Sequence, residues 1–144
     1  MDASDILKRH HLSLDSLTDA AFQLYVGGAK GVQLKKLKRD FENLLRRNIA
    51  DPNVCLLLEA ASHLDDIARS EHKGIFAKDD DPVSLVADEL IGMSIAEYIA
   101  GKRGLFNYVR YDKAKPGVIA KLPPFMDDAI GALVASTMTR LFEE

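Results

Sequence analysis

The sequence predicts an all-α protein of about six helices, folded as a single compact domain over residues 1–144. Three observations support this class. Apolar residues recur every three to four positions along most of the chain, as they do on the buried face of a helix. Two Asp-Pro pairs and one Pro-Pro pair mark helix starts, because Asp favours the N-cap and Pro the first helical position. No segment shows the strict alternation of a half-buried strand.

Two helices are expected at the start of the chain. A short helix at residues 3–10 precedes the break HHLSLDS. A second helix follows over residues 14–26, with its apolar residues on one face, and Gly27-Gly28 ends it.

The next two predicted helices differ in character. Residues 33–49 combine an apolar face with a basic face made of Lys35, Lys36, Lys38, Arg39, Arg46 and Arg47. The following helix opens at Asp51-Pro52 and extends to about residue 69. Because its first half is apolar nearly all round, we expect it to be the central helix of the domain.

The last third of the chain is predicted to hold two helices and a loop. The first helix opens at Asp81-Pro82 and continues to Gly101. Residues 104–122, GLFNYVRYDKAKPGVIAKL, contain Gly, Pro and scattered aromatic residues, which favours a loop with at most a short helical turn. The final helix opens at the Pro-Pro pair that follows.

One pattern occurs twice in these two helices. The acidic pairs Asp88-Glu89 and Asp127-Asp128 are each followed, at four-residue steps from the first acid, by Gly and then Ala, in the stretches ADELIGMSIA and MDDAIGALVA. Residues at this spacing lie on one helix face. Two such narrow faces can pack closely and bring the carboxylates together in apolar surroundings, where they repel one another unless a cation lies between them. The repeat therefore predicts a carboxylate metal site.

A simpler interpretation is that these acids only complement the dipoles at two helix starts. Three points favour a site instead. Asp88 lies about two turns inside its predicted helix, a helix-interior Gly costs about 1 kcal/mol and needs a reason, and the whole pattern recurs.

Ligands that are all oxygen favour Mg²⁺ or Mn²⁺ over zinc. Glu59 stands in the otherwise apolar stretch VCLLLEAA and needs exposure or a positive partner, which a metal would supply. The expected metal ligands are Glu59, Asp88, Glu89 and Asp127, with Asp80 and Asp81 as further candidates just ahead of the first acidic helix. Asp65 and Asp66 are expected on the surface.

Three cations stand close together in the segment predicted as a loop. Arg110, Lys113 and Lys115 precede a Pro-Gly pair, and such a cluster can clamp a phosphate next to a metal. A solvated loop with no ligand is the alternative.

Composition narrows the class of protein further. The formal net charge is −3, which does not indicate a nucleic-acid partner. Cys55 is the single cysteine, so no internal disulfide can form and a reducing compartment is expected. The start of the chain is charged where a signal peptide would be apolar. The most apolar long segment, 123–142, contains two Asp, which disfavours a membrane span. We expect a cytoplasmic protein, with a homodimer as a further expectation.

Two runs of the sequence are specific enough to compare with a family. DDPVSLVADELIGMSIAEYIAG and GLFNYVRYDKAKPGVIAKLPPFMDDAIGALVAS resemble the phosphatidylglycerophosphatase A family, and in particular its small soluble branch, which includes the α-ribazole-5′-phosphate phosphatase of cobalamin biosynthesis. The resemblance is strongest over residues 79–136. It implies an all-α, Mg²⁺-dependent phosphomonoester hydrolase. It also implies an acidic catalytic centre at Asp88, Glu89, Asp127 and Asp128, with Lys113, Lys115 and Gly117 in the basic loop.

The resemblance leads to an expected reaction, the removal of phosphate from a small-molecule ester, α-ribazole phosphate. Lipid-acting relatives have hydrophobic spans that this sequence lacks. The carboxylates would hold one or two Mg²⁺ ions, with Asp128 as the general base and Lys113 and Lys115 neutralising the phosphoryl group. Whether an aspartyl-phosphate forms is left open by the residues.

Two alternatives stay open. The substrate could be the lipid phosphatidylglycerophosphate, reached by peripheral membrane contact through the basic face at residues 35–47. The chain could also be a non-catalytic all-α metal-binding or interaction module, in which the Gly-Ala faces serve helix packing or a dimer interface.

Overall fold

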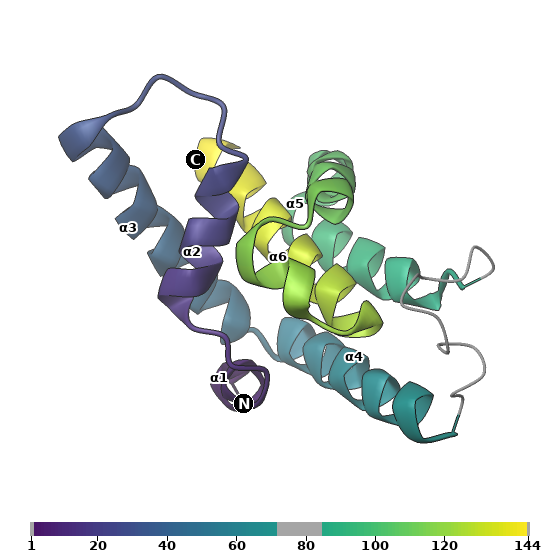
Figure 1. Ribbon diagram of the computed structural model, residues 1–144. Helices are drawn as coiled ribbons and strands as arrows, with labels where there is room; N and C mark the ends of the chain where they lie inside the picture. Colours follow the sequence, from purple (N-terminus) through teal and green to yellow (C-terminus); the bar gives the residue numbers. More distant parts are fainter. Residues whose placement is uncertain (1, 72–84, 144) are drawn as a thin grey trace.

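The computed structural model describes residues 2–71 and 85–143, and over these residues it confirms the all-α class, with six α-helices in one domain (Figure 1). The elements are α1 (Ser4–Arg9), α2 (Leu14–Gln23), α3 (Gly31–Ile49), α4 (Pro52–Glu71), α5 (Ala87–Ala114), a short 3₁₀ helix η1 (Gly117–Lys121) and α6 (Pro124–Glu143).

Two of the three helix starts marked by Pro can be compared with the structure. Asp51 Oδ1 accepts hydrogen bonds from the backbone N–H groups of Asn53, at 2.8 Å, and Val54, at 3.4 Å, so it caps α4 as predicted. The helix α6 begins at the second residue of the Pro-Pro pair. Asp81-Pro82 lies outside the described residues, and the helix expected to open there, α5, begins at Ala87.

The central helix is α6. Every residue from Phe125 to Met138 is buried, and α6 packs against α2, α3, α4, α5 and η1 (Figure 1). The prediction that the helix after Asp51 would be central is wrong: α4 lies against α6 on one side and leaves Leu56 55% exposed on the other. The small residues of α6 explain its position, because Gly and Ala let several neighbours approach its backbone at once.

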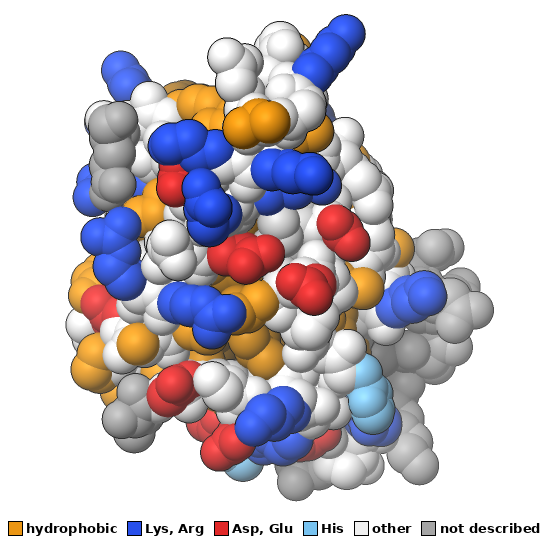
Figure 2. Space-filling model, turned by 90° about the vertical axis from the view of Figure 1, so that its left-hand side faces the viewer, with side chains coloured by type: hydrophobic (Ala, Val, Ile, Leu, Met, Phe, Trp, Pro, Cys, Tyr) orange, Lys and Arg blue, Asp and Glu red, His pale blue; other side chains and the backbone are white. Residues whose placement is uncertain are grey.

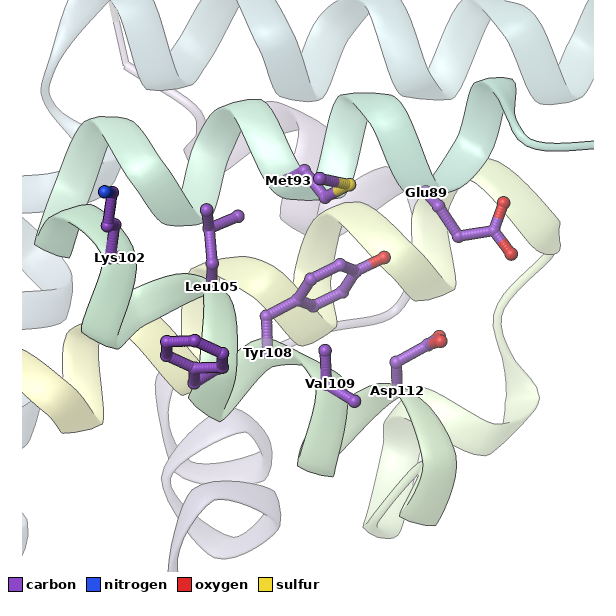
Figure 3. Close-up of a pocket in the computed structure, with 8 residues that line it drawn as sticks. Glu89, Met93, Lys102, Leu105, Tyr108, Val109 and Asp112 are labelled. Carbon is purple, nitrogen blue, oxygen red and sulfur yellow. The ribbon is translucent and has the colours of Figure 1, made fainter.

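The helix α5 consists of two arms. Ala100 and Gly101 have non-helical backbone angles, and Gly101 has φ 62° and ψ −152°, a conformation that only Gly adopts readily. We call residues 87–99 the first arm and residues 102–114 the second arm. The chain turns sharply between them, so that both arms pack on α6 (Figures 1 and 3).

The second arm replaces most of the predicted loop. The loop prediction over residues 104–122 is wrong because its aromatic residues follow helical spacing. Gly104, Tyr108 and Tyr111 are buried on one face of the second arm, and the Tyr111 hydroxyl donates a 2.6 Å hydrogen bond to the carbonyl oxygen of Ala21. Only the Pro-Gly end of the segment leaves the α-helix, first at Lys115 in a left-handed conformation and then as η1.

The two glycines of the repeated motif have different surroundings. A Cβ atom at Gly92 would overlap the hydroxyl and the adjoining ring carbon of Tyr108, and would lie 3.1 Å from the backbone oxygen of Asp128. At Gly131, an added Cβ would meet only the Tyr108 ring, at an ordinary contact distance of 4.0 Å. Gly92 is therefore required because Tyr108 of the second arm packs against the first arm at this position. The surroundings of Gly131 have room for a methyl group.

The basic face predicted for residues 33–49 is present on α3. Figure 2 shows Lys and Arg side chains gathered over the upper part of the face on which α3 lies. Two of these lysines have acidic partners, Lys36 with Asp40 at 2.7 Å and Lys38 with Asp19 at 3.9 Å. Exposed pairs of this kind contribute little to stability. None of the helices in the described ranges is both long enough and apolar enough to cross a membrane.

The glycine comparison gives the first prediction. Gly92→Ala should lower the free energy of unfolding, because the buried ring of Tyr108 must shift, and the loss should exceed the gain of about 1 kcal/mol in helix propensity. Gly131→Ala should leave stability unchanged or raise it by up to about 1 kcal/mol. Urea unfolding of the two variants measures both values. Equal changes in the two variants would contradict the packing described for Tyr108.

Candidate metal centre

Three segments bring five carboxyl groups together. The start of the first arm supplies Asp88 and Glu89, the start of α6 supplies Asp127 and Asp128, and the end of the second arm supplies Asp112. The sequence repeat predicts four of the five residues, and the structure places those four together.

The carboxylates form two groups that share Asp128. In the first group, one oxygen from each of Asp88, Glu89 and Asp128 lies within 4.8 Å of the others. The second group consists of Asp112, Asp127 and Asp128 under the same limit. Two adjoining groups of three oxygen ligands are a suitable arrangement for hard divalent cations.

Burial, rather than distance from the helix start, separates this centre from acids that merely complement a helix dipole. The expectation that Asp88 lies about two turns inside its helix is wrong, since α5 begins at Ala87 and Asp88 is in the first turn. A helix dipole stabilises an acid by about 0.3–1 kcal/mol at an exposed position and by up to about 2 kcal/mol at a partly buried one. Asp88 is 0% exposed and Asp128 is 1% exposed, so both have lost their hydration. A carboxylate in that position needs hydrogen-bond donors or a cation.

The second group contains a cation of the chain itself. Lys115 Nζ lies 2.8 Å from Asp127 Oδ2, 3.4 Å from Asp112 Oδ1 and 3.9 Å from Asp128 Oδ1. Burial alone would lower the pKa of Lys115, but the hydrogen bond to Asp127 and the neighbouring negative charges raise it above the ordinary value. The ammonium group is therefore held charged among these carboxylates.

Among the described residues, the first group meets this cation only at the shared Asp128, at 3.9 Å, and no cation pairs with Asp88 or Glu89. Asp88 Oδ2, Glu89 Oε2 and Asp128 Oδ2 are buried and accept no hydrogen bond from residues 2–71 or 85–143. Burial raises the pKa of Glu89, with Asp88 adding to the effect, and burial together with Asp112 and Asp127 raises the pKa of Asp128. Protons or a metal ion can relieve this repulsion, and the donor set, oxygen alone, fits Mg²⁺ or Mn²⁺. The first group is thus the better candidate for the metal.

Tyr108 is a site residue that the sequence reasoning missed. Its side chain is 3% exposed, it lies between the two arms, and its hydroxyl has no hydrogen-bond partner among the described residues. Burial raises its pKa, and the nearby acids Asp128 and Asp112 raise it further, so it keeps its proton. Tyr108 and Asp112 are four residues apart, a signal that would have indicated a shared helix face had residues 104–114 been predicted as helical.

Several predicted site residues lie elsewhere. Glu59 forms a two-pronged ion pair with Arg9, at 2.8 and 3.0 Å, and its side chain is partly exposed. Arg110 donates to Asn107 Oδ1 and to the carbonyl oxygen of Leu24, both at 2.9 Å, so it supports the contact between the second arm and α2. Lys113 is exposed on the second arm. Of the three predicted phosphate-binding cations, the structure brings Lys115 to the carboxylates.

The remaining metal candidates, Asp80 and Asp81, lie outside the described residues.

Asp65 has a structural role that the sequence does not indicate. The expectation of a surface position holds for Asp66 but is wrong for Asp65, which is 3% exposed. Its two carboxylate oxygens accept hydrogen bonds from the backbone N–H groups of Phe125, at 2.9 Å, and Met126, at 2.8 Å. Burial raises its pKa to about 6, against the lowering effect of these two bonds. Asp65 therefore caps α6 from α4 and fixes the helix start that carries Asp127 and Asp128.

Comparison with solved structures identifies the class of fold. The chain is similar to the low temperature requirement C protein from Listeria monocytogenes, with a TM-score of 0.77 and 24% identity over 98% of this chain and 92% of that chain. It is also similar to a protein of unknown function from Bacillus stearothermophilus, with a TM-score of 0.78 and 22% identity over 98% and 96% of the two chains. At these identities, the likeness shows a shared fold.

A relative that is similar in sequence identifies the family. No family model matches the chain. An uncharacterized protein of Methanocaldococcus jannaschii is 37% identical over 129 residues, which cover 87% of this chain and 99% of that protein. The chain belongs to the same family as this protein.

The capping role of Asp65 can be tested by a stability measurement. Asp65→Asn should reduce the free energy of unfolding by about 1–3 kcal/mol at pH 7, because an amide has one oxygen to accept two backbone N–H bonds. The matched control is Asp66→Asn, next in sequence and exposed, which should stay within about 0.5 kcal/mol of wild type. Urea denaturation at equilibrium gives both numbers. A loss of the same size in the two variants would show that Asp65 does not act as the cap.

Metal binding should stabilise the fold in a pH-dependent way. In the metal-free protein, the pKa values of Glu89 and Asp128 are raised, so protonation of these two acids stabilises the folded state. This stabilisation is lost as the pH rises through the raised pKa values. Mg²⁺ competes with these protons, so the rise in Tm on adding Mg²⁺ should be larger at pH 8 than at pH 5.5. Calorimetry with MgCl₂ and with EDTA measures the difference. An equal rise at both pH values, or none, would contradict a metal in the first group.

Proposed function

We propose that this protein is a metal-dependent phosphomonoester hydrolase. The main support is the first carboxylate group, in which one buried oxygen of each acid accepts no hydrogen bond from the described residues, beside a charged Lys115 in the second group. A centre of five carboxyl groups and one ammonium repels a phosphate unless another cation is bound. With a divalent ion bound, the ion and the Lys115 ammonium group are two adjacent positive charges that can bind a phosphoryl group.

Asp88, Glu89 and Asp128 would hold the ion. Mg²⁺ bound there supplies a Lewis acid that polarises phosphoryl oxygens and lowers the pKa of water. Asp128 belongs to both carboxylate groups, so its position suits a metal ligand shared by the two groups better than the general base that accepts a proton from water. Whether one ion or two bind depends on Lys115, whose ammonium lies among the carboxylates of the second group.

Lys115 and Tyr108 would contact the phosphoryl group. The Lys115 side chain is 32% exposed and donates to Asp127, at 2.8 Å, and to Asp112, at 3.4 Å, so its third N–H bond can reach a ligand. The Tyr108 hydroxyl keeps its proton and can donate one hydrogen bond to an anionic oxygen. Both groups are held by packing before a substrate arrives, which is how electrostatic stabilisation is made effective.

Asp112 is our choice for the base that accepts a proton from the attacking water. It is the most exposed of the three acids in the second group, with 30% of its side chain accessible, against 10% for Asp127 and 2% for Asp128. A base must reach water that approaches from solvent. This assignment replaces the sequence-based choice of Asp128.

The substrate is proposed to be a small phosphate ester, with α-ribazole 5′-phosphate as the first compound to test. The sequence resemblance to the soluble branch of the phosphatidylglycerophosphatase A family supports this choice. The lipid phosphatidylglycerophosphate is less favoured, because the exposed basic face of α3 contributes no residue to the carboxylate groups. A non-catalytic interaction module that binds no metal is also less favoured, since burying carboxylates without partners opposes folding. A non-catalytic metal-binding module is separated from the hydrolase by the activity test.

The test is phosphate release from α-ribazole 5′-phosphate and from phosphatidylglycerophosphate, each with Mg²⁺ and with EDTA. We expect turnover of the first ester that depends on Mg²⁺. Asp88→Asn should reduce kcat by about 10²- to 10⁴-fold, as expected for loss of an electrostatic or acid–base group. Preference for the lipid would change the substrate and keep the reaction class.

Glu97→Gln is the matched control, because Glu97 lies on the same arm of α5 and is exposed. It should retain wild-type kcat. No activity on either ester by folded, Mg²⁺-loaded protein, or full activity in Asp88→Asn, would rule out the proposed function.

A further inference from the structure

A groove runs between the two arms of α5 (Figure 3). Its volume is about 440 Å³, within the range of small-molecule sites in proteins. The lining is mainly apolar, with Met93, Phe106, Tyr108 and Val109 among its residues. Figure 3 shows the carboxylates of Glu89 and Asp112 at one end and Lys102 at the other.

The acidic end of the groove is the metal centre. Glu89 belongs to the first carboxylate group and Asp112 to the second, so both residues line the groove and the centre at once. The Tyr108 hydroxyl points toward this end (Figure 3). That hydroxyl is on a side chain only 3% exposed, and it has no partner among the described residues. A ligand in the groove would therefore place one end beside the carboxylates and the Tyr108 hydroxyl.

The walls of the groove expose large apolar side chains. Phe106 is 76% exposed, Val109 is 48% exposed and Met93 is 43% exposed. Such side chains gathered in a concave surface mark a binding site more often than scattered exposed residues do. An aromatic ring and a thioether at opposite walls favour a flat aromatic ligand, because rings stack on one another and sulfur packs well against a ring edge.

We propose that this groove binds an aromatic group of the phosphate ester, with the ester bond at the acidic end and the ring between Met93 on the first arm and Phe106 and Val109 on the second arm. The inference rests on the proposed function and adds the part of the substrate that is recognised. Lys102 at the far end limits the length of the occupant, which argues for a ring rather than a long acyl chain.

Two alkyl esters with similar leaving groups test the proposal. They are 2-(1-naphthyl)ethyl phosphate, which carries an aromatic group, and glycerol 1-phosphate, which does not. Wild type with Mg²⁺ should show a kcat/KM about tenfold or more higher for the naphthyl ester. Val109→Ser and Phe106→Ser should each reduce this ratio several-fold. Leu56→Ser changes an apolar residue on α4 whose exposure, 55%, lies between those of Val109 and Phe106, and it should leave the ratio unchanged.

A binding measurement separates this inference from the proposed function. The probe is 3-(1-naphthyl)propylphosphonate, in which carbon replaces the ester oxygen, followed by naphthalene fluorescence with Mg²⁺ present. Weaker binding to Val109→Ser than to Leu56→Ser supports the groove even if neither ester is hydrolysed, in which case only the proposed function fails.

Three results would overturn the groove assignment while hydrolysis stands. The first is a wild-type ratio near one for the two esters. The second is octyl phosphate being preferred over the naphthyl ester, which would indicate an acyl chain as the occupant. The third is that Val109→Ser and Phe106→Ser change the sedimentation coefficient and not the ratio, which would indicate that a second copy of the chain covers the groove.

Discussion

Five carboxyl groups meet one ammonium group inside this fold, and the candidate site depends on how these charges are balanced. Moving a carboxylate out of water costs several kcal/mol even after relaxation, whereas a helix N-terminus returns at most about 2 kcal/mol for each acid. The dipoles of α5 and α6 therefore do not offset the loss of hydration at the buried positions of Asp88 and Asp128. Lys115 offsets part of the cost for the second group, and a divalent cation is the partner that suits the first.

Residues that are distant in the sequence position these charges. Asp65 on α4 accepts the backbone N–H bonds at the start of α6 and so sets the position of Asp127 and Asp128. The turn at Gly101 brings the second arm of α5 back beside the first. Because the second arm turns back, Tyr108, Asp112 and Lys115 lie beside the acids of the first arm and α6, and the groove forms between the two arms. The turn at Gly101 is therefore needed both for the complete group of five carboxyl groups and for the groove beside it.

Local sequence patterns predict the helices and most of the acidic centre, since periodicity and the repeat of Asp, Gly and Ala depend only on nearby residues. They do not predict contacts between distant residues. The partner of Glu59 is Arg9, fifty positions earlier in the chain, and the acceptor for the start of α6 is Asp65, about sixty positions before it. Gly104 and Pro116 favour a loop by composition, so the helical second arm, and with it Asp112 and Tyr108, could not be placed at the site.

The candidate site and the proposed function both require a divalent cation bound to Asp88, Glu89 and Asp128. Diffraction from crystals soaked in Mn²⁺, recorded where manganese scatters anomalously, would locate that cation. We expect an anomalous peak bonded to oxygens of these three residues, with Lys115 still paired to Asp127. A map from well-ordered crystals with no peak among the three carboxylates, or with a peak elsewhere alone, would contradict it.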